Sequence, residues 1–169
     1  MKTDFSIEQL DELEHCLAGF CERADADLAL LTDETGQAIV SGGAIRGIEA
    51  ASLAALAAAN LAATMAIARK VGEKSSCRSM LYEGELKRIY VTASPGELVL
   101  LIVTRSDVPI GAVRFFLQET LRSIETITSV ERAPEFTEAL LDEGFDLEDG
   151  LSSLFADTFD GEEPASDNH

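Results

Sequence analysis

Basic residues are rare in this chain of 169 residues, and their scarcity excludes whole classes of partner. Lys and Arg number 13 against 31 Asp and Glu, so the formal net charge is −18. Proteins that bind nucleic acid or an anionic membrane surface use Lys and Arg to neutralise phosphates. We therefore expect no nucleic-acid partner and no attachment to an anionic membrane.

Cysteine and histidine are also rare, with three Cys and two His, and Trp is absent. Cys16, Cys21 and Cys77 include no C-x-x-C pair, and one His is the terminal residue. Neither a metal-ligand spacing nor a Ser-His-Asp arrangement can be assembled from them. The N-terminus has no apolar secretory segment, which favours reduced thiols. We expect a cytoplasmic protein with no metal, no cofactor and no catalytic site of its own.

Residues 50–68 form a run of 19 residues without a charge. The run is mostly Ala, with Ser52, Asn60 and Thr64 interspersed. Membrane-spanning helices are usually rich in Leu, Ile, Phe and Val. The composition therefore favours a buried or interface helix over membrane insertion.

Hydrophobic periodicity predicts three helices and five strands. Ser6 and Gln9 match a capping box before the first helix, and Gly72 follows the second helix where helices often end. The continuous apolar run 98–103 predicts a central strand that is buried on both faces. Turn sequences occupy 33–36 and 94–97. The predicted helices cover 7–23, 48–71 and a segment beginning near Pro109, and the predicted strands cover 28–32, 37–41, 76–82, 86–93 and 98–103.

The predicted elements follow the order α-β-β-α-β-β-β-α. Three consecutive strands joined by tight turns must be antiparallel. We therefore predict an α+β fold, an α/β sandwich in which a five-stranded antiparallel sheet carries helices on its faces. This domain covers residues 1–128, with 18 acidic and 12 basic residues, and an acidic tail follows over 129–169.

The Ala-rich helix is expected to provide the main interaction surface of the domain. Burying a methyl-sized group contributes only about 0.8 kcal/mol. We therefore predict that the larger side chains contact the sheet and that small ones face a partner. Alternatively, the small side is merely exposed and favours the helix by propensity. The predicted sheet contacts are Leu53, Leu56, Leu61, Met65 and Ile67, and the predicted partner-binding residues are Ala55, Ala59, Asn60, Ala63 and Thr64.

The tail has 13 acidic residues and one basic residue, yet it also carries bulky apolar residues. Some recur at i, i+4, i+7 and i+8, which is one face of a helix. Acidic segments with spaced Phe and Leu are typical of motifs that fold on contact with a partner. Packing on the chain's own domain and a role in solubility are the alternatives. The predicted tail motif consists of Phe136, Leu140, Leu141, Leu147, Leu151, Leu154 and Phe155.

The order of elements, together with the residues that fill it, resembles the Roadblock / dynein light-chain family. Within that family, the chain is most similar to the bacterial MglB type, a stand-alone domain with an additional C-terminal tail. The segments that carry the resemblance are the strand and turn at 28–36, the Ala-rich helix at 50–68, the strands around 90–92 and 98–103, and the start of the last helix at 108–111.

The resemblance implies that the chain binds proteins and performs no chemistry itself. Family members dimerise with their second helices side by side and their sheets joined edge to edge, and they bind Ras-like small GTPases. The MglB type activates a GTPase of the MglA type without an arginine finger, by repositioning the GTPase's own switch residues. Under this resemblance, Arg46, Arg69, Arg78 and Arg105 are surface or interface charges.

The expected function is therefore that of a homodimeric regulator of a Ras-like small GTPase in cell polarity or motility. Further polarity or motility proteins are expected to bind through the tail. The alternative is a non-catalytic scaffold that links a GTPase to cytoskeletal or motor partners.

Overall fold

A computed structural model describes residues 5–44, 47, 49–73 and 79–129 of the chain. The predicted tail motif, with its Phe and Leu residues between 136 and 155, lies outside the described residues. Arg46 and Arg78 lie outside them too.

Three helices and five strands follow one another in the predicted order. The last three strands, Ser79–Glu83, Lys87–Ser94 and Leu98–Arg105, are joined by short turns, as the sequence indicates. The elements are α1 (Ile7–Ala24), β1 (Ala26–Asp33), β2 (Ala38–Gly43), α2 (Ala50–Lys70), β3 (Ser79–Glu83), β4 (Lys87–Ser94), β5 (Leu98–Arg105) and α3 (Ile110–Ser129). The α+β prediction is thereby confirmed.

The five strands form one antiparallel sheet in the order β2-β1-β5-β4-β3. β5 is the middle strand, and every residue from Leu98 to Thr104 is buried. Its neighbours β1 and β4 place Leu30 and Val91 opposite Leu101. The sequence prediction of a central strand buried on both faces is confirmed.

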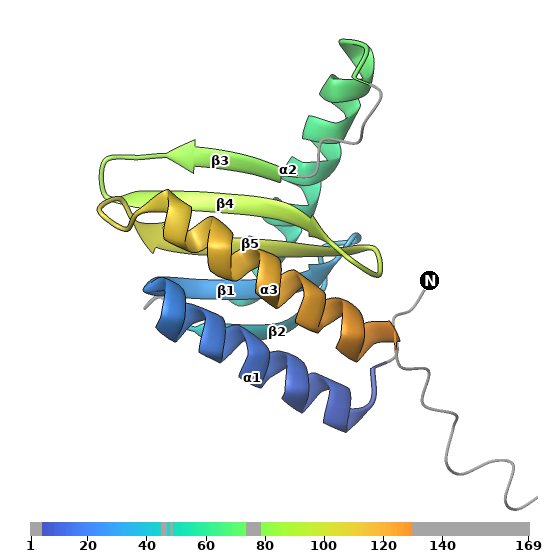
Figure 1. Cartoon of the computed structure of the whole chain (residues 1–169). Helices are drawn as coiled ribbons and strands as arrows, with labels where there is room; N and C mark the ends of the chain where they lie inside the picture. The colour runs from blue at the N-terminus through green and yellow to red at the C-terminus, as the bar shows by residue number, and fades with distance from the viewer. Residues whose placement is uncertain (1–4, 45–46, 48, 74–78, 130–169) are drawn as a thin grey trace, which may run out of the picture. The chain divides into compact units, whose positions relative to one another are not determined.

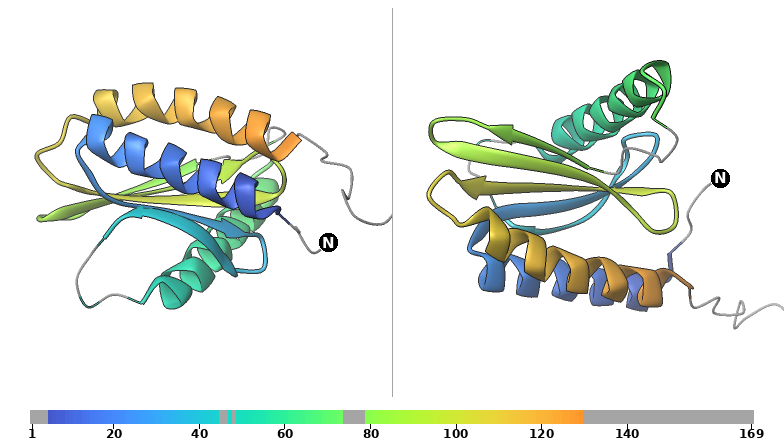
Figure 2. Two further views of the ribbon diagram at one scale, coloured as in Figure 1. Left: turned by 90° about the horizontal axis from the view of Figure 1, so that it is seen from below. Right: turned by 45° about the horizontal axis from the view of Figure 1, so that its top comes forward.

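Helices cover the two faces of the sheet unequally. α1 and α3 lie side by side on one face, and α2 crosses the other face alone (Figures 1 and 2). The core on the α1–α3 side includes Phe20, Leu31 and Ile102, all fully buried. The smaller core under α2 includes Ala54 and Leu101. The α2 face of the sheet is therefore the less completely covered one.

Local signals fix the ends of α1 and β1 as predicted. The Ser6 hydroxyl accepts a hydrogen bond from the Gln9 amide, and the Gln9 side chain accepts one from the Ser6 amide, which completes the capping box. In the β1–β2 turn, Asp33 Oδ1 accepts from the amides of Thr35 and Gln37, both at 2.9 Å. Gly36 adopts φ +89°, a conformation that glycine reaches without strain.

The prediction of which α2 residues contact the sheet is partly wrong. Leu61 is buried and Leu53 and Met65 pack against the same core, but Leu56 and Ile67 are 66 % and 63 % exposed. Ala54, Ala57 and Ala58 are buried against the sheet instead. These small side chains let the helix backbone lie close to the sheet, where Leu and Val side chains of the strands complete the core.

Gly42 in β2 marks a close approach between the sheet and α1. A Cβ atom at this position would overlap the backbone of Leu17 and Ala18. Because the obstructing atoms are backbone, side-chain rotation does not relieve the overlap. Gly19 in α1 is a matched control, since a Cβ added there meets nothing within 4 Å.

We expect Gly42→Ala to lower the free energy of unfolding by about 1–3 kcal/mol, the usual cost of overpacking. We expect Gly19→Ala to raise it by about 0.5–1 kcal/mol, because alanine favours the helix over glycine. Urea unfolding followed by circular dichroism measures both. Equal effects of the two substitutions would contradict the close packing of β2 on α1.

Candidate functional site

The outward side of α2 is apolar and exposed. We call Leu56, Ala59, Ala63 and Ile67 the α2 outer face, because these residues recur at i, i+3, i+7 and i+11 on one side of the helix. All four are exposed. A helix that is apolar on all sides is ordinarily covered on all sides, so this face is suited to bind an apolar surface.

Within the part of the chain that the structure describes, α2 is the one helix long and apolar enough to cross a membrane, judged by length and composition. Only 22 % of that stretch is buried. A helix that a partner protein covers can be equally long, apolar and exposed in the single chain. The absence of membrane insertion remains a prediction.

The five predicted partner-binding residues divide into two groups. Ala55, Ala59 and Ala63 are exposed, as a contact surface requires. Asn60 and Thr64 are half-buried and turn toward the edge strand β3. The Asn60 amide nitrogen donates to the Tyr82 hydroxyl at 2.8 Å, and the Thr64 hydroxyl donates to the Met80 sulfur at 3.3 Å. These two polar residues therefore tie α2 to β3.

A groove of about 460 Å³ runs between α2 and the β3–β4 hairpin. Ala57, Val91 and Leu101 are its buried lining residues, and Lys87 and Glu83 contribute the charged groups. Sequence analysis missed the contributions of Tyr82 and Ile89, which are partly exposed beside the helix. The groove can accept apolar side chains. Its lining consists of Leu53, Leu56, Ala57, Asn60, Tyr82, Glu83, Gly84, Lys87, Ile89, Val91 and Leu101.

The edge strand β3 lies next to this groove. β3 pairs with β4 along one side and has no described strand along the other. An edge strand presents unpaired backbone N–H and C=O groups that can pair with another chain. The exposed α2 outer face, the groove and the free strand edge are therefore contiguous features of the same side of the domain.

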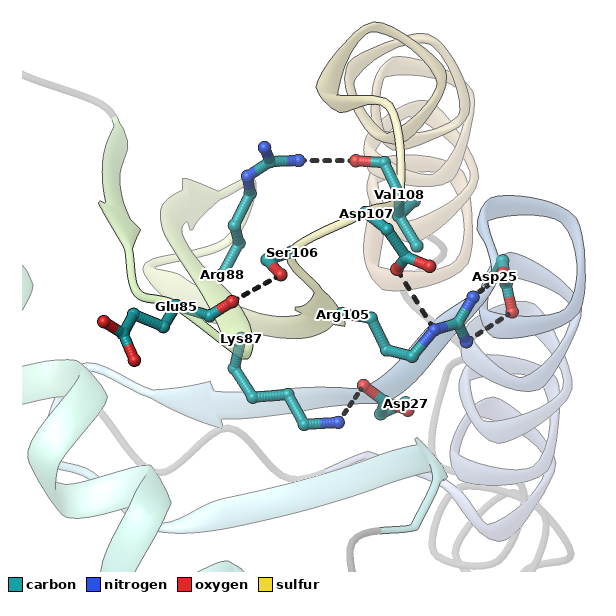
Figure 3. A network of polar contacts seen from close by, with 9 residues as sticks. All are labelled: Asp25, Asp27, Glu85, Lys87, Arg88, Arg105, Ser106, Asp107 and Val108. Atoms are coloured by element: carbon teal, nitrogen blue, oxygen red, sulfur yellow. Dashed lines mark hydrogen bonds and ion pairs between the residues drawn. The ribbon is translucent and has the colours of Figure 1, made fainter.

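Ion pairs hold together the far end of the sheet, where α1 ends and α3 begins (Figure 3). The Arg105 guanidinium donates to Asp25 at 2.7 Å and to Asp107 at 3.1 Å. Its hydrogen bond to Asp25 lowers the pKa of that carboxyl group. Lys87 pairs with Asp27 at 2.8 Å. The expectation that Arg105 is a surface charge agrees with these partly exposed contacts.

Two further hydrogen bonds in this network hold the β5–α3 loop, one to strand β4 and one to the β3–β4 turn. Arg88 donates to the Val108 carbonyl at 2.6 Å, just before α3 begins. The Ser106 hydroxyl donates to the Glu85 carbonyl at 2.7 Å. Exposed ion pairs contribute roughly 0–1 kcal/mol each, so the network mainly orients the β5–α3 loop.

The described cysteines are poor nucleophiles. Burial raises the pKa of Cys21 to about 11 and also raises that of Cys16. Both thiols are therefore protonated near neutral pH, where the thiolate is the reactive form. No group of three or more His, Cys, Asp and Glu in the described ranges is placed to hold a metal ion.

Comparison with known proteins agrees with this geometry. The family model of the Roadblock/LC7 domain matches residues 15–104. No curated protein sequence matches the chain.

Solved structures of MglB proteins share the fold. MglB of Myxococcus xanthus is 26 % identical, with a TM-score of 0.68, over 73 % of this chain and 92 % of that one. MglB of Thermus thermophilus, described as a gliding protein, is 23 % identical, with a TM-score of 0.65, over 74 % of this chain and 93 % of that one. A structure described as MglB with a tetrameric arrangement has the same identity, TM-score and shares of the two chains.

The unequal burial of two leucines in α2 gives a stability test. Leu61→Ala should lower the free energy of unfolding by about 2–5 kcal/mol, because Leu61 is buried in the sheet core. Leu56→Ala should change it by about 0.5 kcal/mol or less, as is usual for exposed positions. Unfolding in urea at low protein concentration, where association contributes little, compares them. A larger loss for Leu56→Ala would contradict the orientation of α2.

Proposed function

Because the chain belongs to the Roadblock/LC7 domain family, we propose that it is a homodimeric regulator of a Ras-like small GTPase of the MglA type. In this proposal it modulates or activates GTP hydrolysis, in the context of cell polarity or motility. The observation that carries the proposal is the exposed apolar outer face of α2 beside the groove and the free edge of β3.

Self-association is the first part of the proposal. Leu56 and Ile67 expose most of their surface in the single chain. Covering a Leu or Ile side chain contributes about 1.5–3 kcal/mol. Ala59 and Ala63 between them are small enough to let a second helix backbone approach closely. Pairing of β3 with β3 of a second copy would at the same time provide hydrogen-bond partners for the backbone N–H and C=O groups along the strand edge. The similarity to an MglB with a tetrameric arrangement supports association.

Binding of a small GTPase is the second part. The apolar groove beside α2 offers a GTPase an anchoring site for apolar side chains. Arg105 is already engaged by two carboxylates. Arg69 lies in the last turn of α2, where a cation stabilises the helix end. We propose that the regulator supplies no arginine to the nucleotide and acts by positioning residues of the GTPase itself.

A scaffold without effect on hydrolysis is the second candidate. It is favoured by the acidic tail, whose spaced Phe and Leu residues suit a further partner. Deletion of residues 130–169 separates the two functions. A scaffold loses a third protein on deletion, whereas an activator loses hydrolysis rate or affinity for the GTPase.

Dimerisation can be tested on α2. Ala59→Arg places a large charge in the α2 outer face and should convert the chain to a monomer, because an unpaired charge is costly to bury. Thr126→Arg is the matched control on the exposed side of α3. Light scattering gives the mass of each variant. An unchanged dimer in Ala59→Arg would place the interface elsewhere.

Regulation can be tested with the GTPase of the MglA type from the same organism. We expect single-turnover GTP hydrolysis to accelerate when the chain is added at saturating concentration, with the complex verified by co-elution. Ala59→Arg should reduce the acceleration and Thr126→Arg should not. A complex that forms without acceleration would exclude activation and leave the scaffold function.

A further inference from the structure

The outer side of α3 carries an aromatic residue between two cations. We call Arg114, Phe115, Gln118 and Arg122 the α3 outer patch. All four are exposed, and their spacing of i, i+1, i+4 and i+8 places them along one side of the helix. α3 lies on the opposite face of the sheet from α2 (Figure 2), so the patch is separate from the surface proposed above.

Phe115 is the uncovered member of an aromatic pair. It is 71 % exposed, whereas Phe116 packs against the core. The two rings meet edge to face, with centroids 5.3 Å apart. Arg23 of α1 lies over the Phe116 ring at 5.3 Å and is held there by Glu119 at 2.8 Å. Phe116 is thus covered on its outer side, while Phe115 offers its ring to a ligand.

The two arginines of the patch differ from most other cations of the domain. Arg23, Lys87, Arg88 and Arg105 each form an ion pair with a carboxylate. Arg114 and Arg122 form none with any residue that the structure describes, nor do Arg69 and Lys70 in the last turn of α2. Arg69 and Lys70 lie at the C-terminal end of α2, where a positive charge interacts favourably with the helix dipole. Arg114 and Arg122, by contrast, lie neither in an ion pair with a described residue nor in the last turn of a helix.

We infer that the α3 outer patch binds an acidic amphipathic segment of a partner protein. A Phe or Leu of the segment contacts Phe115, and carboxylates on either side of it pair with Arg114 and Arg122. The two Cα positions are about 12 Å apart along α3, so the carboxylates are two helical turns apart in a helical segment.

Charge complementarity selects this occupant and its position. The neighbouring helix α1 exposes acidic side chains, namely Glu8, Asp11, Glu12, Glu14 and Glu22. A basic segment is therefore attracted toward α1, whereas an acidic one is repelled from α1 and held at the α3 arginines. Glu125 follows Arg122 by one turn and limits the patch at that end.

The test uses the full chain and two fluorescein-labelled helical peptides. In the first peptide, Glu pairs two turns apart flank a central Phe. In the second, each Glu is replaced by Lys. Fluorescence anisotropy measures affinity for the wild-type chain, for Arg114→Glu/Arg122→Glu and for Phe115→Ser. The matched control is Arg69→Glu/Lys70→Glu, which makes the same change of charge on α2.

We expect the Glu peptide to bind the wild-type chain and the α2 control equally well. Its affinity should fall about tenfold in the α3 charge reversal, because two ion pairs become repulsive contacts, and it should also fall in Phe115→Ser. Circular dichroism verifies that each variant is folded. Failure of the Glu peptide to bind, equal binding of the Lys peptide, or equal losses in the α2 and α3 charge reversals would overturn the inference.

Discussion

A five-stranded sheet has two faces to cover, and this domain has three helices with which to cover them. α1 and α3 together bury the face that includes Phe20 and Ile102, so one helix is left for the other face. A single helix is too narrow to span five strands. The groove beside α2 and the partly exposed residues of the β3–β4 hairpin result from this shortage, and the free edge of β3 lies next to them.

The small residues of α2 make the shortage more pronounced. Ala54, Ala57 and Ala58 bring the helix close to the sheet, and its larger Leu56 and Ile67 point outward. A helix with this arrangement covers less of the sheet than a Leu-rich one, and it displays apolar area that a monomer does not use. Close packing on one side and exposure on the other are thus two results of the same sequence.

The fold could be predicted because its signals are local. The capping box at Ser6 and Gln9 and the apolar run from Leu98 each identify an element without reference to the rest of the chain. The orientation of α2 could not be predicted, because a helix that is apolar on every side has no hydrophobic periodicity that would identify its buried face. Tyr82 and Ile89 were missed as groove residues because their position depends on strand register and on where α2 crosses the sheet.

The pairing of β1 with β5 has a consequence for how the chain folds. Leu31 pairs with Leu100, and β2, α2, β3 and β4 all lie between them in the sequence. The β1–β2 and β3–β4 hairpins can close early, whereas the middle of the sheet waits for a contact between distant segments, which is slow. During synthesis, α2 is complete before β3, β4 and β5 exist, so only the β1–β2 hairpin is available to cover its apolar surface. The nascent chain therefore exposes an apolar helix until β5 is made, and early association with a partner or a chaperone would shorten that exposure.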